Sequence, residues 1–155
     1  MAELVEDTVR EILEEVVAGL GLNGTVAVER DHEVVTGTVE GEDLGLFIGR
    51  HGQTIDAVQH LIFRIALARG AGDEGDLRVV IDAEGYRARR ADALQRVADQ
   101  AAEDARRYGR PVALDAMTAS ERKLVHEYLR DRGGVETYSE GEEPARHLVV
   151  APLVV

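Results

Sequence analysis

The sequence contains no cysteine among its 155 residues. Disulfide frameworks, thiolate metal sites and cysteine nucleophiles are therefore excluded, and packing alone must hold the fold together. No apolar run approaches the ~20 residues that a membrane-spanning helix requires. Residues 1–17 also lack the basic start and the continuous apolar stretch of a signal peptide. We expect a cytoplasmic protein that does not insert into a membrane.

Positive charge is scarce as well. The formal net charge of −12 argues against a nucleic-acid ligand, because phosphate contacts need lysine and arginine. The charge is unevenly distributed, however. Residues 1–45 hold 2 basic and 12 acidic side chains, whereas residues 87–110 hold 7 basic and 4 acidic ones, and residues 46–69 carry a smaller basic excess. The overall charge thus leaves a nucleic-acid-binding function open.

Apolar spacing predicts the elements of the first half of the chain. Residues 2–20 carry a helical apolar stripe, and the β-rich runs 25–30 and 33–39 predict an antiparallel hairpin. Asp43 is placed to cap a short helix over residues 44–48. A second amphipathic helix follows to about residue 69, and residues 77–82 predict a third strand.

The second half begins with a predicted amphipathic helix over residues 86–108. Its apolar side consists of Leu94, Val97, Ala98, Ala101, Ala105 and Tyr108. A short strand over 112–114 comes next, and then a helix opened by Thr118 and Glu121, which have capping-box spacing. Two strands are expected at 135–139 and 146–151. The composition changes near Gly85, so the predicted domains are 1–84 and 85–155.

A pair of glycines interrupts the helical region of the first domain. Glycine costs up to about 1 kcal/mol against alanine inside a helix, so Gly49 and Gly52 mark a turn needed for its shape. Such a turn brings backbone amides and a helix N-terminus close to a ligand, and an anion suits it. Arg50 and His51 would add positive side chains at the tip. An ordinary helix-helix turn is the alternative interpretation.

The run Ile48-Gly-Arg-His-Gly-Gln-Thr-Ile55, followed by Ala57-Val58-Gln59, is similar to the core of KH domains, whose Gly-x-x-Gly loop clamps about four single-stranded nucleotides. The element order resembles the type II version, a three-stranded sheet with helices on one face. The resemblance implies that residues 49–52 form the clamp and that Ile48, with Ile55 and Val58, lines a groove for bases. Core packing is the alternative for Ile55 and Val58. The acidic loop 70–76 would repel a phosphate backbone.

A second pattern lies on the capped helix of the second domain. Arg122 and His126 are four residues apart, and helical geometry groups them with Lys123 and Arg130 on the outward side. These side chains suit phosphate contact and base stacking, although an ordinary solvated helix face has the same spacing. His126 lacks partners at metal-ligand spacing and any residue pattern for a proton relay, so no catalytic residue, metal or cofactor is expected.

Arg122-Lys-Leu-Val-His126, together with the tract Tyr138-Ser-Glu-Gly-Glu-Glu-Pro-Ala-Arg146, resembles the single-stranded nucleic-acid-binding domain named for its R-x-x-x-H motif. The tandem resembles the Jag/KhpB family of bacterial proteins. This implies an α+β fold in which a type II KH domain precedes a small α/β R-x-x-x-H domain. Some members carry a further N-terminal domain, which we expect to be absent because the KH helix starts at Met1. The resemblance also implies a small KH-only partner protein and roles in RNA regulation and cell shape.

The resulting hypothesis is a non-enzymatic binder of single-stranded RNA or DNA that acts as an RNA chaperone or post-transcriptional regulator. Its expected RNA contacts are Ile48, Gly49, Arg50, His51, Gly52, Arg122, Lys123, His126 and Arg130. Arginines of the helix 86–108 either add phosphate contacts or form a solvated face. The alternative is a protein-protein or homodimer module that does not bind RNA, for which the acidic helix 2–20 is the best support. An enzyme with His126 as general base has little support.

Overall fold

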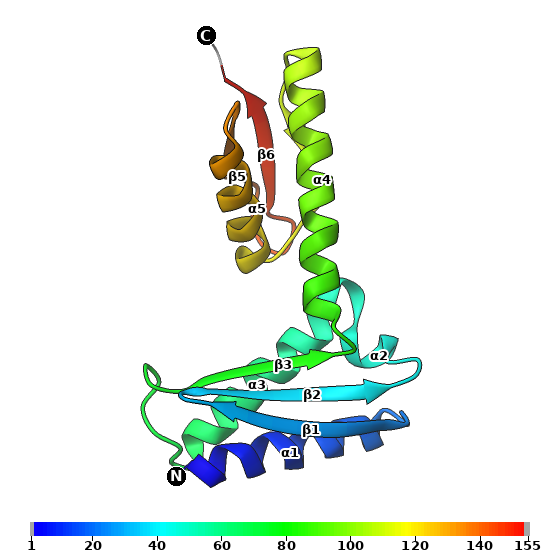
Figure 1. Ribbon diagram of the computed structural model, residues 1–155, viewed down its shortest axis with the longest axis vertical. Helices are drawn as coiled ribbons and strands as arrows, with labels where there is room; N and C mark the ends of the chain where they lie inside the picture. The colour runs from blue at the N-terminus through cyan, green and yellow to red at the C-terminus, as the bar shows by residue number, and fades with distance from the viewer. Residues whose placement is uncertain (1, 154–155) are drawn as a thin grey trace. The chain divides into compact units, whose positions relative to one another are not determined.

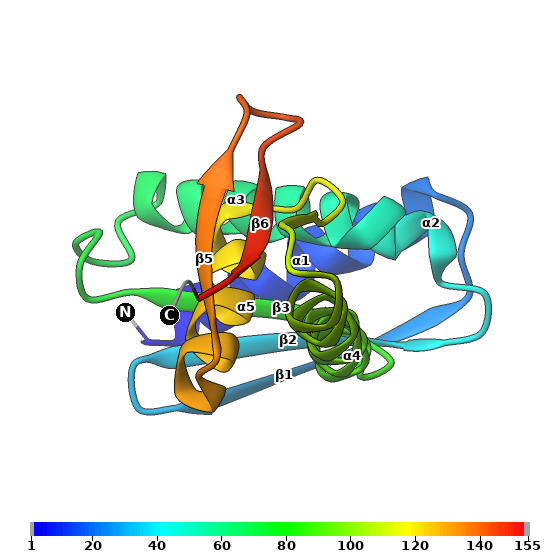
Figure 2. The same ribbon diagram turned by 90° about the horizontal axis from the view of Figure 1, so that it is seen from above.

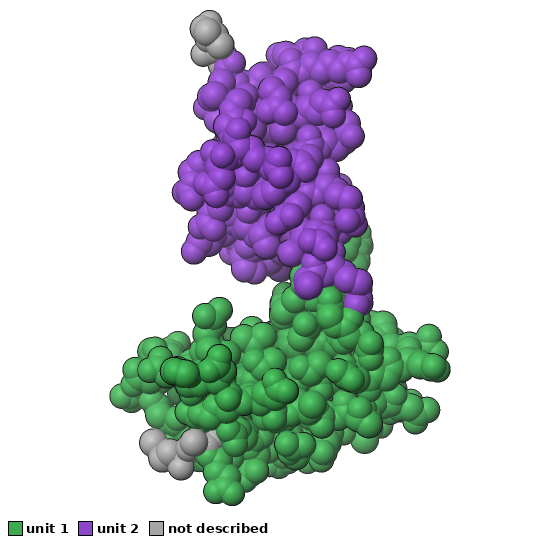
Figure 3. All heavy atoms as spheres, viewed as in Figure 1, with its two compact units in different colours: residues 1–87 green, residues 88–155 purple. Residues whose placement is uncertain are grey.

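The computed structural model describes residues 2–153 and divides into two compact units, residues 1–87 and 88–155 (Figure 3). Within the described residues, no helix combines the length and the hydropathy needed to cross a lipid bilayer. The same residues contain no group of three or more His, Cys, Asp or Glu side chains placed to hold a metal ion.

Unit 1 is a three-stranded sheet with helices on one face (Figures 1 and 2). Its elements are α1 (Ala2–Gly19), β1 (Gly24–Asp31), β2 (Val34–Gly41), α2 (Gly45–Ile48), α3 (Gln53–Ala68) and β3 (Arg78–Ala83). β1 and β2 form the predicted antiparallel hairpin, and β3 runs parallel to β2 on its other side, which gives the order β1-β2-β3. Because successive strand residues face opposite sides, alternate residues of β2 and β3 are buried under the helices.

The core of unit 1 lies between α1, α3 and that sheet face. Its largest fully buried side chains are Phe47, Leu13, Ile55, Ile62 and Ile81. At Gly37 of β2 an added Cβ would lie 2.6 Å from Leu13 Cδ1 and 2.6 Å from Val9 Cγ1. The absence of a side chain at Gly37 therefore allows α1 to pack directly on the central strand.

Unit 2 contains most of α4 (Tyr86–Tyr108), then β4 (Val112–Ala113), α5 (Ala119–Arg132), β5 (Val135–Glu140) and β6 (His147–Pro152). Its three strands are antiparallel in the order β4-β6-β5, with Thr137 opposite Val150 and Tyr138 opposite Val149. The core consists of the buried faces of α4, α5 and the sheet, including Leu94, Val125, Leu129, Leu148 and Val150.

The predicted apolar side of α4 is correct for four of its six residues and wrong for the other two. Leu94, Ala98, Ala101 and Ala105 are buried, together with Ala102, which the prediction omitted. Val97 and Tyr108 are 48% and 58% exposed. Alanines dominate the buried face and allow close packing, so the contact stripe is narrower than the run of apolar positions suggests.

The two predicted helix caps have different outcomes. Thr118 and Glu121 form the capping box at the start of α5, with Thr118 Oγ1 accepting from the Glu121 amide at 3.3 Å and Glu121 Oε2 accepting from the Thr118 amide at 3.2 Å. Asp43 does not cap α2, because the residue at the N-cap is Leu44 and no side chain bonds the helix start. Asp43 has a positive φ of 54°, whereas capping residues have extended backbone.

Candidate nucleic-acid interface

The glycine pair joins α2 to α3 through a tight turn, which we call the GxxG turn (residues 49–52). Gly49 follows α2 with φ 73° and ψ 179°, a conformation that is essentially restricted to glycine. Arg50–Gly52 form one 3-10 turn, in which His51 has φ 54° and Gly52 has φ 80°. Three of the four residues thus have positive φ, so the chain reverses within one turn and α3 begins at once.

Packing behind the GxxG turn also requires both glycines. A Cβ on Gly49 would lie 2.2 Å from Thr54 Oγ1, and a Cβ on Gly52 would lie 2.8 Å from Cε1 of Tyr86. Neither position has room for a side chain. The side chains that the turn does present are those of Arg50 and His51, and both residues are exposed.

The exposed side of the turn carries groups that suit an anion. No side chain caps the N-terminus of α3, where the positive end of the helix dipole lies. The Gln53 amide bonds the Arg50 carbonyl within the 3-10 turn, and the acid of the first turn is Asp56, which pairs with Arg87. Arg50 and His51 make no side-chain hydrogen bond or ion pair with any residue of the described range 2–153. The turn therefore offers an exposed guanidinium, an exposed imidazole and the start of a helix, which are groups that suit an anion such as a phosphate.

The apolar residues beside the turn divide between core and surface. Ile55 is fully buried in α3 and Val58 is 8% exposed, so both belong to the core of unit 1. Ile48, at the end of α2, is only partly buried and packs against the edge of that core. Of the three, Ile48 has the most surface left for contact with a base.

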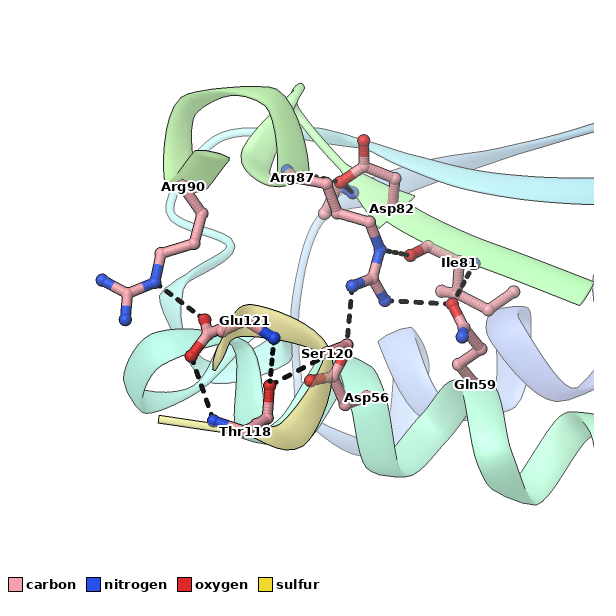
Figure 4. Close-up of polar contacts among 10 residues, drawn as sticks. Asp56, Gln59, Ile81, Asp82, Arg87, Arg90, Thr118, Ser120 and Glu121 are labelled. Carbon is pink, nitrogen blue, oxygen red and sulfur yellow. Dashed lines mark hydrogen bonds and ion pairs between the residues drawn. The ribbon is translucent and has the colours of Figure 1, made fainter. Parts of the chain in front are cut away.

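In unit 2, α5 is fixed at its first turn by the capping box and by α4. Glu121 Oε1 accepts a hydrogen bond from Arg90 Nε at 2.9 Å, and its other oxygen caps the helix at Thr118 (Figure 4). Both side chains of this ion pair are mostly buried, at 22% and 13% exposure. Arg90 is therefore a packing residue and not a free phosphate ligand.

Arg122 does not share the outward side of α5, which corrects the helical-geometry prediction. It is 8% exposed, and Nη1 donates to the Met117 carbonyl at 2.7 Å while Nη2 pairs with Glu143 Oε1 at 2.9 Å. Glu143 lies in the turn between β5 and β6, which covers this side of the helix. Arg122 thus ties that turn to α5.

A pocket of about 410 Å³ lies between α5 and strands β5 and β6, and we call it the α5 groove. Its lining residues are Ala119, Arg122, Lys123, His126, Thr137, Tyr138, Ser139, Arg146 and Leu148. His126 Nδ1 forms a hydrogen bond with Thr137 Oγ1. Lys123 is exposed, and its Nζ lies 4.0 Å from Glu127 Oε1. Arg122, Lys123 and His126 therefore do share one site, with Arg122 forming its buried wall.

Sequence reasoning placed Arg130 in this site and omitted three polar residues. Arg130 does not line the groove, and its Nε lies 3.7 Å from Asp131 Oδ1. Thr137, Ser139 and Arg146 do line it, and Arg146 donates to the Gly141 carbonyl at 2.7 Å. The alternation along β5 places Thr137 and Ser139 on the face of the core residue Val135, which was a usable signal. Ser139 and Arg146 also belong to the tract 138–146 that carries the resemblance to the R-x-x-x-H domain, but no binding role was assigned to them from it.

Comparison with known proteins matches the same two parts of the chain. The family model described as KhpA/KhpB, KH domain, matches residues 6–81, and the model of the R-x-x-x-H domain matches residues 92–152. The fold is therefore a KH domain followed by an R-x-x-x-H domain, which confirms the predicted α+β class.

The curated relatives of this chain include several proteins named RNA-binding protein KhpB. The protein of Clostridium symbiosum is 32% identical over 96% of this chain and 67% of its own length. The proteins of Lactiplantibacillus plantarum and Bacillus subtilis are 38% and 33% identical over 88% and 91% of this chain, which correspond to 41% and 66% of their lengths. This chain belongs to the KhpB family.

Proposed function

We propose that this chain binds single-stranded RNA, without catalysing a reaction, through the GxxG turn and the α5 groove. The observation that carries the proposal is the geometry of the GxxG turn. Its glycine backbone permits close approach, Arg50 and His51 are unpaired within residues 2–153, and the start of α3 is uncapped. These features suit the backbone of an extended strand better than a compact protein surface.

The α5 groove supports the same ligand class. It combines the cations of Lys123 and Arg146 with the hydroxyls of Thr137 and Ser139 and the imidazole of His126. Lysine and arginine contact phosphates, and hydroxyl groups contact phosphate or sugar oxygens. The name of the KhpB relatives, RNA-binding protein, adds support for RNA. We extend the proposed ligands to single-stranded DNA. The proposed role is that of an RNA chaperone or a post-transcriptional regulator. The chain would act alone, with a KH-only partner protein or with a second copy of itself.

Binding is measured by titrating a labelled single-stranded RNA pool with the intact protein at two salt concentrations. Each phosphate contact should add roughly 0.7 to the magnitude of the slope of log affinity against log salt for a single strand. A DNA pool of matched sequence compares the two sugars. Absence of salt-sensitive binding by folded protein would refute the proposal and favour the protein-interaction module instead.

His51→Asn tests the GxxG turn with a close control. His32, in the β1–β2 hairpin, has φ 56°, nearly that of His51 at 54°, and asparagine tolerates this conformation. His51→Asn should weaken RNA binding, whereas His32→Asn should not. Arg50→Ala is compared in the same way with Arg10→Ala on α1, which removes the same charge from an exposed position. Equal effects within either pair would argue against contact at the turn.

Lys123→Ala and Arg130→Ala separate the α5 groove from the exposed surface of α5. Both changes remove one exposed positive charge from the same helix, but only Lys123 lines the groove. Lys123→Ala should therefore weaken binding more than Arg130→Ala does. Similar losses would place the contact on the outer face of the helix. Arg122 is a poor first choice for substitution, because its buried side chain also bonds the Met117 carbonyl and its loss would disturb the structure around the groove.

A further inference from the structure

Arg87 lies six residues beyond the end of the KH match, in the first turn of α4, and its guanidinium bonds three acceptors inside unit 1. Nε donates to the Ile81 carbonyl at 2.7 Å, Nη1 to Asp56 Oδ1 at 2.9 Å and Nη2 to Gln59 Oε1 at 3.0 Å (Figure 4). Asp56 and Gln59 belong to α3 and Ile81 to β3. One guanidinium therefore connects the helix that follows the GxxG turn to the strand beside it.

Gln59 completes this connection. Its Oε1 accepts a second hydrogen bond, from the Ile81 amide, at 2.9 Å. The amide and the carbonyl of Ile81 are thus both bonded to side chains, and β3 is an outer strand of the sheet. The Arg87 backbone amide donates in turn to Asp82 Oδ1 at 3.2 Å. The first turns of α3 and α4 are tied to the same stretch of β3.

Tyr86 supports the GxxG turn directly. A Cβ on Gly52 would lie 2.8 Å from Cε1 and 3.2 Å from the hydroxyl oxygen of Tyr86, so the ring lies against the last residue of the turn. Asp56, the Arg87 partner on α3, comes four residues after Gly52, in the first turn of that helix. Two adjacent residues of α4 therefore hold the turn, one by ring contact and the other through α3.

We propose that Tyr86 and Arg87 are positioning residues for the GxxG turn, so that the first turn of α4 completes the nucleic-acid site of the KH domain. This inference rests on the proposed RNA binding. The Arg87 and Asp56 side chains are 34% and 39% exposed. An ion pair with this much exposure to solvent adds little to the free energy of unfolding. Its effect is geometric, because the planar guanidinium reaches three fixed acceptors and a lysine cannot.

Two conservative substitutions separate positioning from direct phosphate contact. Arg87→Lys keeps the charge and loses the three-way geometry. Asp56→Asn removes a negative charge near the turn, so charge alone would strengthen RNA binding, whereas loss of positioning weakens it. We expect both variants to bind RNA about two- to tenfold more weakly, the range that corresponds to one hydrogen bond.

The matched controls are Arg10→Lys and Asp7→Asn on α1. Both control residues are exposed, and their side chains make no hydrogen bond or ion pair within residues 2–153. Neither control should change RNA affinity beyond the small effect of its charge. Tighter binding by Asp56→Asn, or unchanged binding by Arg87→Lys, would overturn the proposal.

Amide hydrogen exchange in the RNA-free protein supplies an independent measurement. Arg87→Lys and Asp56→Asn should both speed exchange at residues 49–59 and leave the β1–β2 hairpin unchanged, which also shows that unit 1 is folded. Unchanged exchange at the turn would overturn the positioning role. If the intact protein binds no RNA, the proposed function fails, while exchange still decides whether Arg87 holds the turn.

Discussion

Gly49→Ala tests whether the GxxG turn depends on the packing behind it, beyond its backbone conformation. The chain offers a control with the same geometry, because Gly133 at the end of α5 also has φ 73° and ψ 179°. A Cβ on Gly133 would have no heavy atom within 4 Å, whereas a Cβ on Gly49 would lie 2.2 Å from Thr54 Oγ1 and 2.8 Å from the Thr54 amide nitrogen. The two substitutions share backbone strain and differ in the clash.

The expected magnitudes follow from these two terms. Holding alanine in this glycine-only region costs about 1–3 kcal/mol, which is the expected loss for Gly133→Ala. Overpacking adds about 1–3 kcal/mol, so Gly49→Ala should lose about 2–6 kcal/mol. Thr54 cannot relieve the clash by rotating its side chain, because its backbone nitrogen is also too close.

Urea unfolding, monitored through amide hydrogen exchange in each unit, measures the stability losses of Gly49→Ala and Gly133→Ala separately, since the two substitutions lie in different units. RNA titration of the same proteins should show weaker binding for Gly49→Ala and wild-type binding for Gly133→Ala. Equal stability losses would refute the argument that Thr54 closes the space behind the turn.

Three further predictions concern stability. Gly37→Ala should lower the free energy of unfolding in urea by about 1–3 kcal/mol, because its Cβ would overlap side chains of α1. Gly45→Ala, whose Cβ would have no atom within 4 Å, should change it by no more than about 0.5 kcal/mol. Equal values would contradict the close packing of α1. Thr118→Ala should destabilise unit 2 by about 0.5–2 kcal/mol through loss of the capping box, and an unchanged urea midpoint would show that the cap contributes nothing. The hydrogen bond and the charge of Arg69 hold the pKa of the Glu11 carboxyl below its ordinary value, so this carboxylate adds stability above its unfolded pKa that is lost as the pH falls through the lower folded pKa. Glu11→Gln should therefore flatten the acid-side fall in Tm, and a pH profile that matches the wild type would contradict this.

Most secondary structure was predictable because its signals are local. The helix predicted over residues 86–108 is α4, Tyr86–Tyr108, and the capping box at Thr118 formed as its spacing indicated. Period-two and period-3.6 apolar patterns depend on neighbours within one or two turns, so the sequence contains all the information they need. The Asp43 prediction failed because a capping residue type is common to many turns, and backbone conformation decides its use.

The sequence by itself determined the order of elements, the two-part organisation of the family and the chemistry at the tip of the GxxG turn, since Arg50 and His51 are set by their position between the glycines. Only the tertiary structure decided which cations are free. Arg122 is bound to Glu143, and Arg87 is bound to Asp56, 31 residues earlier in the chain. Helical periodicity gives the direction of a side chain but not what another segment places there, and a carboxylate brought near by the fold turns a candidate phosphate ligand into a structural tie.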